Sequence, residues 1–317
     1  MIPPEAMIDS DLSADIVANV PFFRNGVPDI LDKAKIRDRY GELIHLRSPL
    51  GSYDLKSTSG STGRPLRVFF SEWDHAVVRA CYCRLYEYLP KLHYKSVSIR
   101  HYEKSEPLDA PWTPVLHYVK ATDTLFAHTF RYLSSKETGQ DLATALTTIE
   151  PALIEGYASA IYLAARFLRA RQKTLPSVEV ISPSGEFIPD AYRKLFSEVF
   201  PRAMICDRYG AVEVGAIAWQ CPICRNYQLN ADFFSLDTTG ERTLISKRFV
   251  SAAHLYRYDL GDPIAPQENR CSIELPSIKI LEGRRDDFLV DQDGEILPIM
   301  PYDLDTIPGL VQWQIVQ

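Results

Sequence analysis

One short loop in this chain gathers hydroxyl side chains, glycines and a single arginine immediately before the strand-like run 66–70. The loop consists of Thr58, Ser59, Gly60, Ser61, Thr62, Gly63 and Arg64, followed by Pro65. Glycines let backbone N–H groups turn toward an anion, hydroxyls add donors, and a guanidinium supplies positive charge. These residue types suit a polyphosphate, although the glycine spacing is not that of the Walker loop. Similar clusters also form plain surface turns, so the interpretation depends on the segments downstream.

Two further polar segments with glycine follow the strands of a predicted strand–helix–strand unit. Residues 178–181 and 203–206 are predicted strands, and 189–200 is the helix between them, with a proline tolerated in its first turn. This order predicts a right-handed parallel unit in an α/β sheet. The loops 182–186 and 207–210 would then follow the carboxyl ends of strands, where open parallel sheets bind their ligands.

The other elements are predicted with uneven support from the sequence. Residues 71–74 have the pattern of a capping box, and apolar residues then recur at helical spacing. Further helices are expected over 30–40, 141–149 and 152–171. Residues 91–135 are rich in tyrosine, histidine and proline but weakly periodic, so they are assigned neither an element nor a role.

The composition is that of an ordinary soluble globular protein with room for one large or two smaller cores. Of the 317 residues, 46% are hydrophobic and 24% charged, and the net charge of −6 offers no basic surface for nucleic acid. The first five residues are not a signal peptide, and no apolar run approaches the roughly 18 residues of a membrane span. Six cysteines are too few for a disulfide scaffold, so a cytoplasmic, reducing compartment is expected.

Four segments downstream join the Ser/Gly loop in a recognisable order. They are Ser184-Gly185-Glu186, Tyr209-Gly210-Ala211-Val212-Glu213, Arg257-Tyr258-Asp259-Leu260-Gly261-Asp262 and Gly283-Arg284-Arg285-Asp286-Asp287. From about Pro21 to the C-terminus, the chain resembles the adenylate-forming superfamily of acyl-CoA synthetases and adenylation domains. Within it, the phenylacetate–coenzyme A ligase branch is most similar. That branch also fits Gly156-Tyr157-Ala158-Ser159 and Cys221-Pro222-Ile223-Cys224.

The resemblance implies an α/β fold and a ligase activity. A large ATP- and acyl-binding domain with mostly parallel sheets flanked by helices would span 1–282. A hinge at Asp286 and an incomplete C-terminal subdomain would span 283–317. A carboxylic acid would attack the α-phosphorus of ATP, giving acyl-AMP and pyrophosphate, and coenzyme A or a carrier-protein thiol would then accept the acyl group. ATP and Mg²⁺ are the implied cofactors.

The resemblance also assigns the groups that would act on the phosphates and the ribose. The loop 58–64 would hold the β- and γ-phosphates, with Arg64 as a catalytic residue. Glu213 would bind Mg²⁺, for which a hard carboxylate oxygen is suited. Asp262 would accept hydrogen bonds from the ribose hydroxyls, and Arg284 would assist at the ribose or the phosphate.

The resemblance also implies which residues would contact the adenine. Gly185 and Glu186 would lie along the base, and Asp207 would accept a hydrogen bond from its amino group. Tyr209, followed by Gly210, would cover the face of the ring.

Each of these assignments has a structural alternative. Arg64 could be a solvated surface charge, and Tyr209 could cap the sheet with a half-buried ring. Glu213 could be an acid in the first turn of a helix, and Asp262 could form a turn after its glycine. Arg284 could pair with neighbouring acids.

The implied acyl pocket lies between the helix after Gly156 and the loop after Glu213. Its candidate lining residues are Tyr157, Ala158, Ala211, Gly215 and Ile217. They are apolar or small and include no acid to hold an amino group, so an aryl or short arylalkyl acid is expected. Tyr157 could equally be a core aromatic.

Two departures from the family pattern bear on activity. The residue before the metal-binding glutamate is normally a threonine or serine whose hydroxyl reaches the α-phosphate, but here it is Val212. Losing one such donor costs about a hundredfold in rate. The family's catalytic lysine lies far into the C-terminal subdomain, and no lysine follows Lys279 here. We therefore expect slow adenylation by this chain alone, with a lysine-bearing C-terminal partner or a longer reading frame supplying the remainder.

The competing interpretation is a non-catalytic relative that binds a nucleotide or acyl ligand. Val212 and the missing lysine favour it. The retained Arg64, Glu213, Asp262 and Arg284 favour an enzyme. Pyrophosphate exchange separates the two.

The cysteines allow a structural zinc ion. Cys221 and Cys224 have the two-residue spacing of a zinc knuckle, and Cys271 is a third candidate ligand. Asn269 stands where the resemblance puts a fourth ligand, so three ordinary reduced cysteines are an equal alternative. A zinc-stabilised interaction domain is the least favoured function. The other cysteines are expected to be packing residues.

Overall fold

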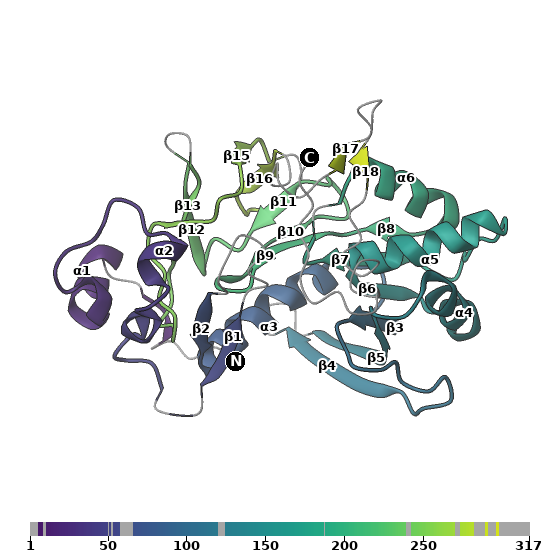
Figure 1. Cartoon of the computed structure of the whole chain (residues 1–317), viewed down its shortest axis with the longest axis horizontal. Helices are drawn as coiled ribbons and strands as arrows, with labels where there is room; N and C mark the ends of the chain where they lie inside the picture. Colours follow the sequence, from purple (N-terminus) through teal and green to yellow (C-terminus); the bar gives the residue numbers. More distant parts are fainter. Residues whose placement is uncertain are drawn as a thin grey trace, which may run out of the picture. The chain divides into compact units, whose positions relative to one another are not determined.

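The computed structural model consists of two compact units (Figure 1). It describes residues 6–8, 11–49, 51, 53–57, 66–119, 124–186, 188–238, 242–269 and 273–281, with the backbone of 289–290 and 296–297. The first unit comprises Met1–Leu89 and Arg208–Leu281, and the second comprises Pro90–Asp207 and Glu282–Gln317. The domain boundary predicted at residues 282–283 lies outside the described residues and remains a prediction.

The long helix α3, several short helices and antiparallel sheets build the first unit. Its earlier elements are α1 (Leu12–Asn19), η2 (Pro21–Phe23), α2 (Lys33–Ile36), η3 (Tyr40–Leu43), β1 (Asp54–Ser57), β2 (Arg67–Phe70) and α3 (Glu72–Glu87). Its later strands are β9 (Arg208–Ala211), β10 (Gly215–Gln220), β11 (Tyr227–Leu229), β12 (Phe234–Asp237), β13 (Leu244–Lys247), β14 (Tyr258–Asp259), β15 (Ile264–Gln267) and β16 (Ser277–Ile280). β1 pairs with β2, and β12, β13 and β14 form a second sheet. The others run antiparallel in the order β15–β16–β11–β10–β9.

Helix α3 begins at the predicted capping box, which is confirmed. The Ser71 hydroxyl accepts a hydrogen bond from the Asp74 N–H at 3.3 Å, and the Asp74 carboxylate accepts one from the Ser71 N–H at 2.9 Å. Val77, Cys81 and Leu85 then recur as buried residues at helical spacing. Because α3 packs on β10, this cap helps to place the strand pair that bears the predicted motif 209–213.

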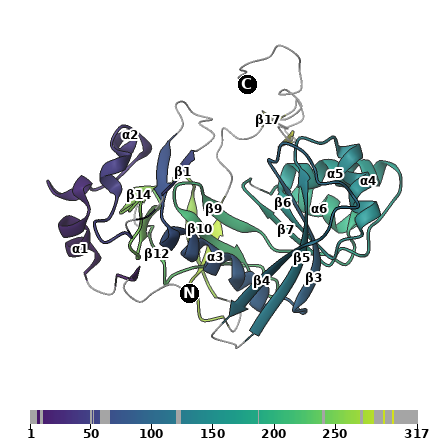
Figure 2. The ribbon, with the colours of Figure 1, turned by 90° about the horizontal axis from the view of Figure 1, so that it is seen from below.

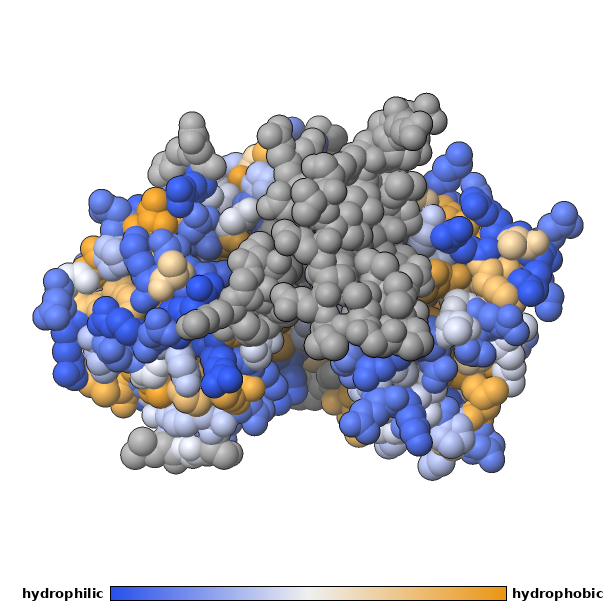
Figure 3. All heavy atoms as spheres, in the orientation of Figure 1, coloured by the Kyte–Doolittle hydropathy of each residue, from blue (hydrophilic) through white to orange (hydrophobic). Residues whose placement is uncertain are grey.

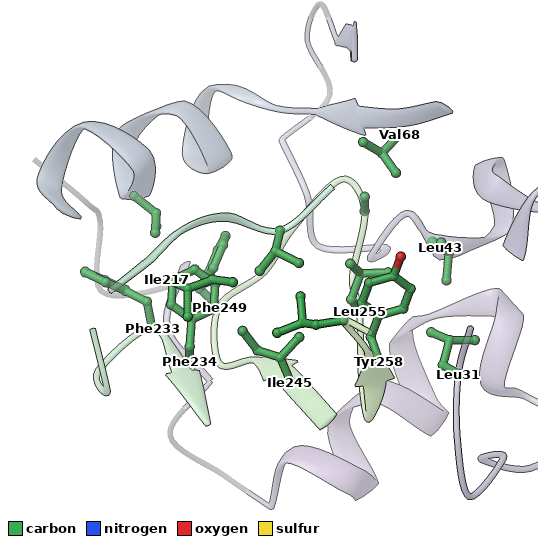
Figure 4. Packing of buried hydrophobic residues seen from close by; sticks show 14 of the residues in the cluster. Leu31, Leu43, Val68, Ile217, Phe233, Phe234, Ile245, Phe249, Leu255 and Tyr258 are labelled. Carbon is green, nitrogen blue, oxygen red and sulfur yellow. The ribbon is translucent and has the colours of Figure 1, made fainter. Parts of the chain in front are cut away.

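The core of the first unit draws side chains from segments far apart in the sequence (Figure 4). Phe249 lies edge to face with Phe233 and Phe234, at ring-centroid distances of 6.3 and 6.0 Å. Such edge-to-face pairs add to the stability that burial of the rings provides. Tyr258 contributes its fully buried ring to the same cluster, so the position of its hydroxyl is fixed by the core.

In its described residues, the second unit consists of a mostly parallel sheet and the helices α4, α5 and α6 (Figure 2). The elements are β3 (His93–Arg100), β4 (Thr113–Val119), β5 (Thr124–Ser134), α4 (Gly139–Ile149), β6 (Leu153–Tyr157), α5 (Ala158–Ala170), β7 (Val180–Ser184), α6 (Asp190–Val199), β8 (Met204–Ile205), β17 (Leu289–Val290) and β18 (Ile296–Leu297). Strands β8, β7, β6, β3 and β5 are parallel neighbours in that order, and the edge strand β4 runs antiparallel to β5. Helix α5 packs against α4 and α6. The predicted α/β fold is confirmed.

The strand–helix–strand unit predicted over 178–206 is confirmed. β7 precedes α6 in the chain, β8 follows it, and the two strands pair in parallel. The loops expected after these strands are only partly loops. β7 extends to Ser184, so Gly185 and Glu186 alone follow it among the described residues of 182–186. Of 207–210, the last three residues form the start of β9 instead of a loop, because they pair with β10.

The helix predicted over 152–171 is wrong in its first part. Leu153–Tyr157 forms β6, and α5 begins only at Ala158. Gly156 has a φ of +136°, and a Cβ there would lie 1.9 Å from the Ile99 carbonyl oxygen. A short apolar run cannot be told from a helix by its period alone, which explains the error.

Two further regions differ from the sequence analysis. The helix expected over 30–40 is reduced to α2, with η3 beginning at Tyr40. Residues 91–135, which were assigned no element, supply β3, β4 and β5.

Hydrophobic residues are scattered among hydrophilic ones over the described surface shown in Figure 3. Within the described residues, every helix is too short or too polar to cross a bilayer.

Candidate functional site

The predicted motif 209–213 lies on a tight hairpin of the first unit. Ala211 pairs with Gly215, and the Val214 N–H donates to the Ala211 carbonyl at 3.1 Å, which closes a three-residue turn between β9 and β10. Gly215 has a φ of +107°, a conformation that favours glycine. A Cβ on Gly210 would lie 2.4 Å from the Gly215 carbonyl oxygen. The hairpin itself therefore requires both glycines.

The first two residues of this turn have opposite environments. Val212 is 48% exposed, whereas Glu213 is only 3% exposed. Glu213 Oε1 accepts a hydrogen bond from Tyr258 Oη at 2.8 Å and lies 3.3 Å from Lys33 Nζ. A buried carboxylate requires such partners, because burial without them is costly. The alternative that Glu213 occupies the first turn of a helix is wrong, since it lies in a hairpin turn.

A second contact involves Tyr209 and Asp262. Tyr209 Oη donates a hydrogen bond to Asp262 Oδ2 at 2.7 Å. The preceding Gly261 has a φ of +75°, and its N–H donates to Asp259 Oδ1 at 2.9 Å. Asp259 thus supports the turn with its side chain, and Asp262 faces the tyrosine.

These two side-chain hydrogen bonds join segments 209–213 and 258–262. Their partners are 45 and 53 residues apart in the sequence. The structure therefore brings together two motifs that the sequence analysis assigned to one nucleotide site. Tyr258, although part of a motif, was given no role, and Lys33 was marked by neither motif nor periodicity.

The groups around Glu213 do not fit a divalent metal ion held by the protein. Mg²⁺ requires a near-octahedral shell of oxygen ligands, which at nucleotide sites come from one or two carboxylates together with waters and phosphates. Here the carboxylate is already matched by a hydroxyl donor and the Lys33 ammonium, whose charge repels a second cation. Within the part of the chain that the structure describes, no group of three His, Cys, Asp or Glu side chains is placed to hold a metal. The magnesium role of Glu213 remains a prediction.

In the second unit, Glu186 is bound to the start of α5. Its carboxylate accepts hydrogen bonds from the Ser159 N–H at 2.6 Å and the Ser159 hydroxyl at 2.7 Å. Burial raises the pKa of Glu186, and these two hydrogen bonds oppose that shift. Glu186 thereby fixes the loop after β7 to a helix whose own N-cap, Tyr157, makes no side-chain capping bond.

Gly185 and Tyr157 are in contact in the same unit. Gly185 has a φ of +82°, and a Cβ there would lie 3.1 Å from Tyr157 Cε1. The structure thus places a candidate adenine-loop residue against a candidate acyl-pocket residue. Asp207, the other candidate adenine contact in this unit, is buried with Arg193 Nη2 3.9 Å from its Oδ2.

The remaining acyl-pocket candidates lie in different settings. Ala158 and Ile217 are fully buried in hydrophobic cores. Ala211 and Gly215 are half-buried at the hairpin. Their role as an acyl pocket remains a prediction.

Several predicted residues lie outside the described part of the chain. They are Thr58, Ser59, Gly60, Ser61, Thr62, Gly63, Arg64, Cys271, Arg284 and Asp286. Their assignments remain predictions.

The described part of the zinc motif consists of two reduced cysteines, Cys221 and Cys224. Cys221 Sγ accepts a hydrogen bond from the Ile223 N–H at 3.4 Å, and Cys224 Sγ accepts one from Gln228 Nε2 at 3.7 Å. Burial raises the pKa of Cys221 to about 11, although the backbone N–H groups of Cys224 and Ile223 oppose this. Zinc binding remains a prediction.

Comparison with known proteins finds likeness in fold and not in sequence. No family model and no curated protein matches the chain. An open conformation of 2-hydroxyisobutyryl-CoA ligase in complex with 2-HIB-AMP and CoA matches with a TM-score of 0.65 and 13% identity, over 93% of this chain and 76% of that one. The same ligase with R3-HIB-AMP in the postadenylation state gives 0.62 and 13%, over 93% and 69%. In the thioesterification state it gives 0.62 and 14%, over 90% and 68%. The chain thus shares the fold of 2-hydroxyisobutyryl-CoA ligase.

Proposed function

We propose that this chain binds ATP and activates a carboxylic acid as acyl-AMP with release of pyrophosphate. The acyl group then passes to the thiol of coenzyme A or a carrier protein. The observation that supports this most strongly is the pair of side-chain hydrogen bonds between segments 209–213 and 258–262. The resemblance puts nucleotide contacts on both segments, and the fold is that of an acyl-CoA ligase.

Tyr209 and Asp262 supply the proposed nucleoside contacts. An ionised carboxylate has several acceptor sites, so Asp262 has capacity for ribose hydroxyls in addition to its bond to Tyr209. That bond also orients the Tyr209 ring, whose face suits stacking with adenine. The pair therefore positions base and sugar together.

Positive charge is the second requirement of the reaction. The attacking carboxylate and the ATP phosphates are all anionic, so neutralisation and positioning provide most of the rate. Arg64 and Arg284 are the proposed charges at the phosphates, with the loop 58–64 supplying further donors.

The proposed acid is aryl or arylalkyl, as in the phenylacetate–coenzyme A ligase branch. The candidate lining residues are apolar or small, and none of them is an acid that could hold a substrate amino group. An amino acid is therefore a poorer substrate.

A second candidate function is nucleotide binding without adenylation. It is favoured by Val212, which presents an exposed apolar side chain where the resemblance puts a hydroxyl. Loss of one transition-state donor lowers rate far more than affinity. Such a protein would bind ATP and exchange pyrophosphate slowly or not at all.

Pyrophosphate exchange into ATP, with a panel of aryl, arylalkyl and short aliphatic acids, tests the proposal. Calorimetry on the same protein measures ATP binding. We expect exchange that depends on an aryl or arylalkyl acid. Asp262→Asn should weaken ATP binding by about fivefold or more, since it removes the charge at the ribose contact. Asp232→Asn, which alters a surface acid paired with Arg84, is the matched control and should bind ATP normally.

The outcomes are distinct. ATP binding without exchange for any acid would support the second function and contradict the first. Absence of ATP binding at millimolar concentration would contradict both.

A further inference from the structure

The buried carboxylate of Glu213 is paired with a cation that belongs to the chain itself. Lys33 Nζ lies 3.3 Å from Glu213 Oε1, and the same oxygen accepts the Tyr258 hydroxyl. Side-chain exposure differs across the pair, 30% for the lysine and 3% for the glutamate. The ammonium therefore contacts a buried carboxylate, while part of the lysine side chain is exposed to solvent.

The backbone holds Lys33 in this position. The Leu31 N–H donates to the Arg257 carbonyl at 2.9 Å, and the Asp259 N–H donates to the Leu31 carbonyl at 2.8 Å. These bonds tie the segment before Lys33 directly to the strand that carries Tyr258. Asp32 then caps α2, accepting a hydrogen bond from the Lys35 N–H at 2.8 Å. The lysine and the tyrosine that flank the glutamate thus share one support.

Among the described residues, a second ion pair lies near Glu213. Lys247 Nζ is fully buried, lies 3.5 Å from Asp74 Oδ1, and also interacts electrostatically with Glu213. Two carboxylates, Glu213 and Asp74, are therefore balanced by two ammonium groups, Lys33 and Lys247. A divalent cation at Glu213 would need to displace one of these ammonium groups or bind against its repulsion.

We propose that Lys33 replaces a protein-bound metal ion at Glu213, and that the ammonium of this partly exposed side chain binds the nucleotide phosphates. This inference rests on the proposed ATP binding. It makes Lys33 a phosphate-binding residue and makes Glu213 its partner in the protein, which partly neutralises the lysine charge. Affinity for ATP then does not depend on a metal ion coordinated by the protein.

Calorimetric titration of ATP, once with excess EDTA and once with Mg²⁺, tests this inference on four variants. The wild-type affinities in the two media should agree within about threefold. Lys33→Met should weaken binding about tenfold in EDTA, because the phosphate loses its counter-charge. Glu213→Gln should leave ATP binding equal or tighter in both media, since the Lys33 ammonium is then released from its carboxylate.

Lys35→Met is the matched control on the same helix, because Lys35 pairs with the exposed Asp32 and not with Glu213. It should behave like the wild type. If Lys33→Met does not fold, Glu213→Gln and the charge-preserving Lys33→Arg test the inference instead. Each should bind ATP with similar affinity in EDTA and in Mg²⁺.

Changes in ATP affinity opposite to those expected would overturn the inference. A wild type that binds ATP at least tenfold more weakly in EDTA, together with weaker Mg²⁺-supported binding by Glu213→Gln, would identify Glu213 as a metal ligand. A wild type that binds no ATP in either medium would refute the proposed function, and this inference with it.

Discussion

Val212 places an exposed, donor-free side chain next to the buried Glu213 in a three-residue turn. Threonine has nearly the same shape as valine, and the position is half in solvent, so the fold tolerates the exchange. Val212→Thr should change the free energy of unfolding by less than about 0.5 kcal/mol. It should raise the rate of acid-dependent pyrophosphate exchange by about tenfold to a hundredfold, because it restores a transition-state donor.

Val212→Ala serves as the control, since it alters the side chain without adding a donor. Equal exchange rates for the threonine and alanine variants would show that this turn does not face the reacting phosphate.

Acid pH should destabilise the first unit through two buried histidines. His254 is fully buried, and its burial, with the charges of His45 and Lys247, holds its pKa well below the usual 6.5. Burial also lowers the pKa of His45, although Asp15 opposes this. The unfolded chain takes up protons as the pH falls through about 6.5 while the folded chain does not. The free energy of unfolding therefore falls below that pH, by up to about 1.4 kcal/mol per pH unit for each histidine.

Urea unfolding between pH 5 and pH 8 measures this dependence. His254→Leu should flatten the slope below pH 6.5, because one proton-uptake site disappears from the unfolded chain. An unchanged slope would show that His254 does not contribute.

At the scale of elements, the close approach of β6 to β3 depends on Gly156. Alanine there would place its Cβ 1.9 Å from a backbone oxygen of β3, at a φ of +136° that side chains avoid. We expect Gly156→Ala to reduce the free energy of unfolding by about 3 kcal/mol or more.

Gly41→Ala is the matched control, because a Cβ there meets no atom within 4 Å. Denaturant midpoints of the two variants should differ clearly. Similar midpoints would mean that β6 and β3 can separate at little cost.

The sequence predicted those elements whose signals are local and complete. Helix α3 has both a capping box and an apolar period, and β7, α6 and β8 are separated by recognisable turns. β6 was missed because it runs into α5 without a turn residue between them. β5 was missed because His128 and Arg131 are buried within it, which breaks the apolar alternation that marks a strand.

In the candidate site, too, the sequence predicted the residues that lie in local motifs. Tyr209, Glu213 and Asp262 lie in motifs that a resemblance can identify from one sequence. Lys33 could not be found this way, because its contact with Glu213 is created by long-range packing around Leu31 and Tyr258.

At the scale of the whole molecule, the fold likeness to an acyl-CoA ligase extends over 93% of the chain at 13% identity. At that identity a shared fold does not establish a shared function, because function depends on specific residues. The proposed activity therefore depends on the two hydrogen-bonded segments of the first unit and on the charges assigned to the phosphates.

The structure of this chain with a non-hydrolysable acyl-adenylate mimic is the most direct test. We predict ribose hydroxyls within hydrogen-bonding distance of Asp262 and an adenine ring stacked on Tyr209. A mimic bound away from both residues, or none bound at millimolar concentration, would contradict the account.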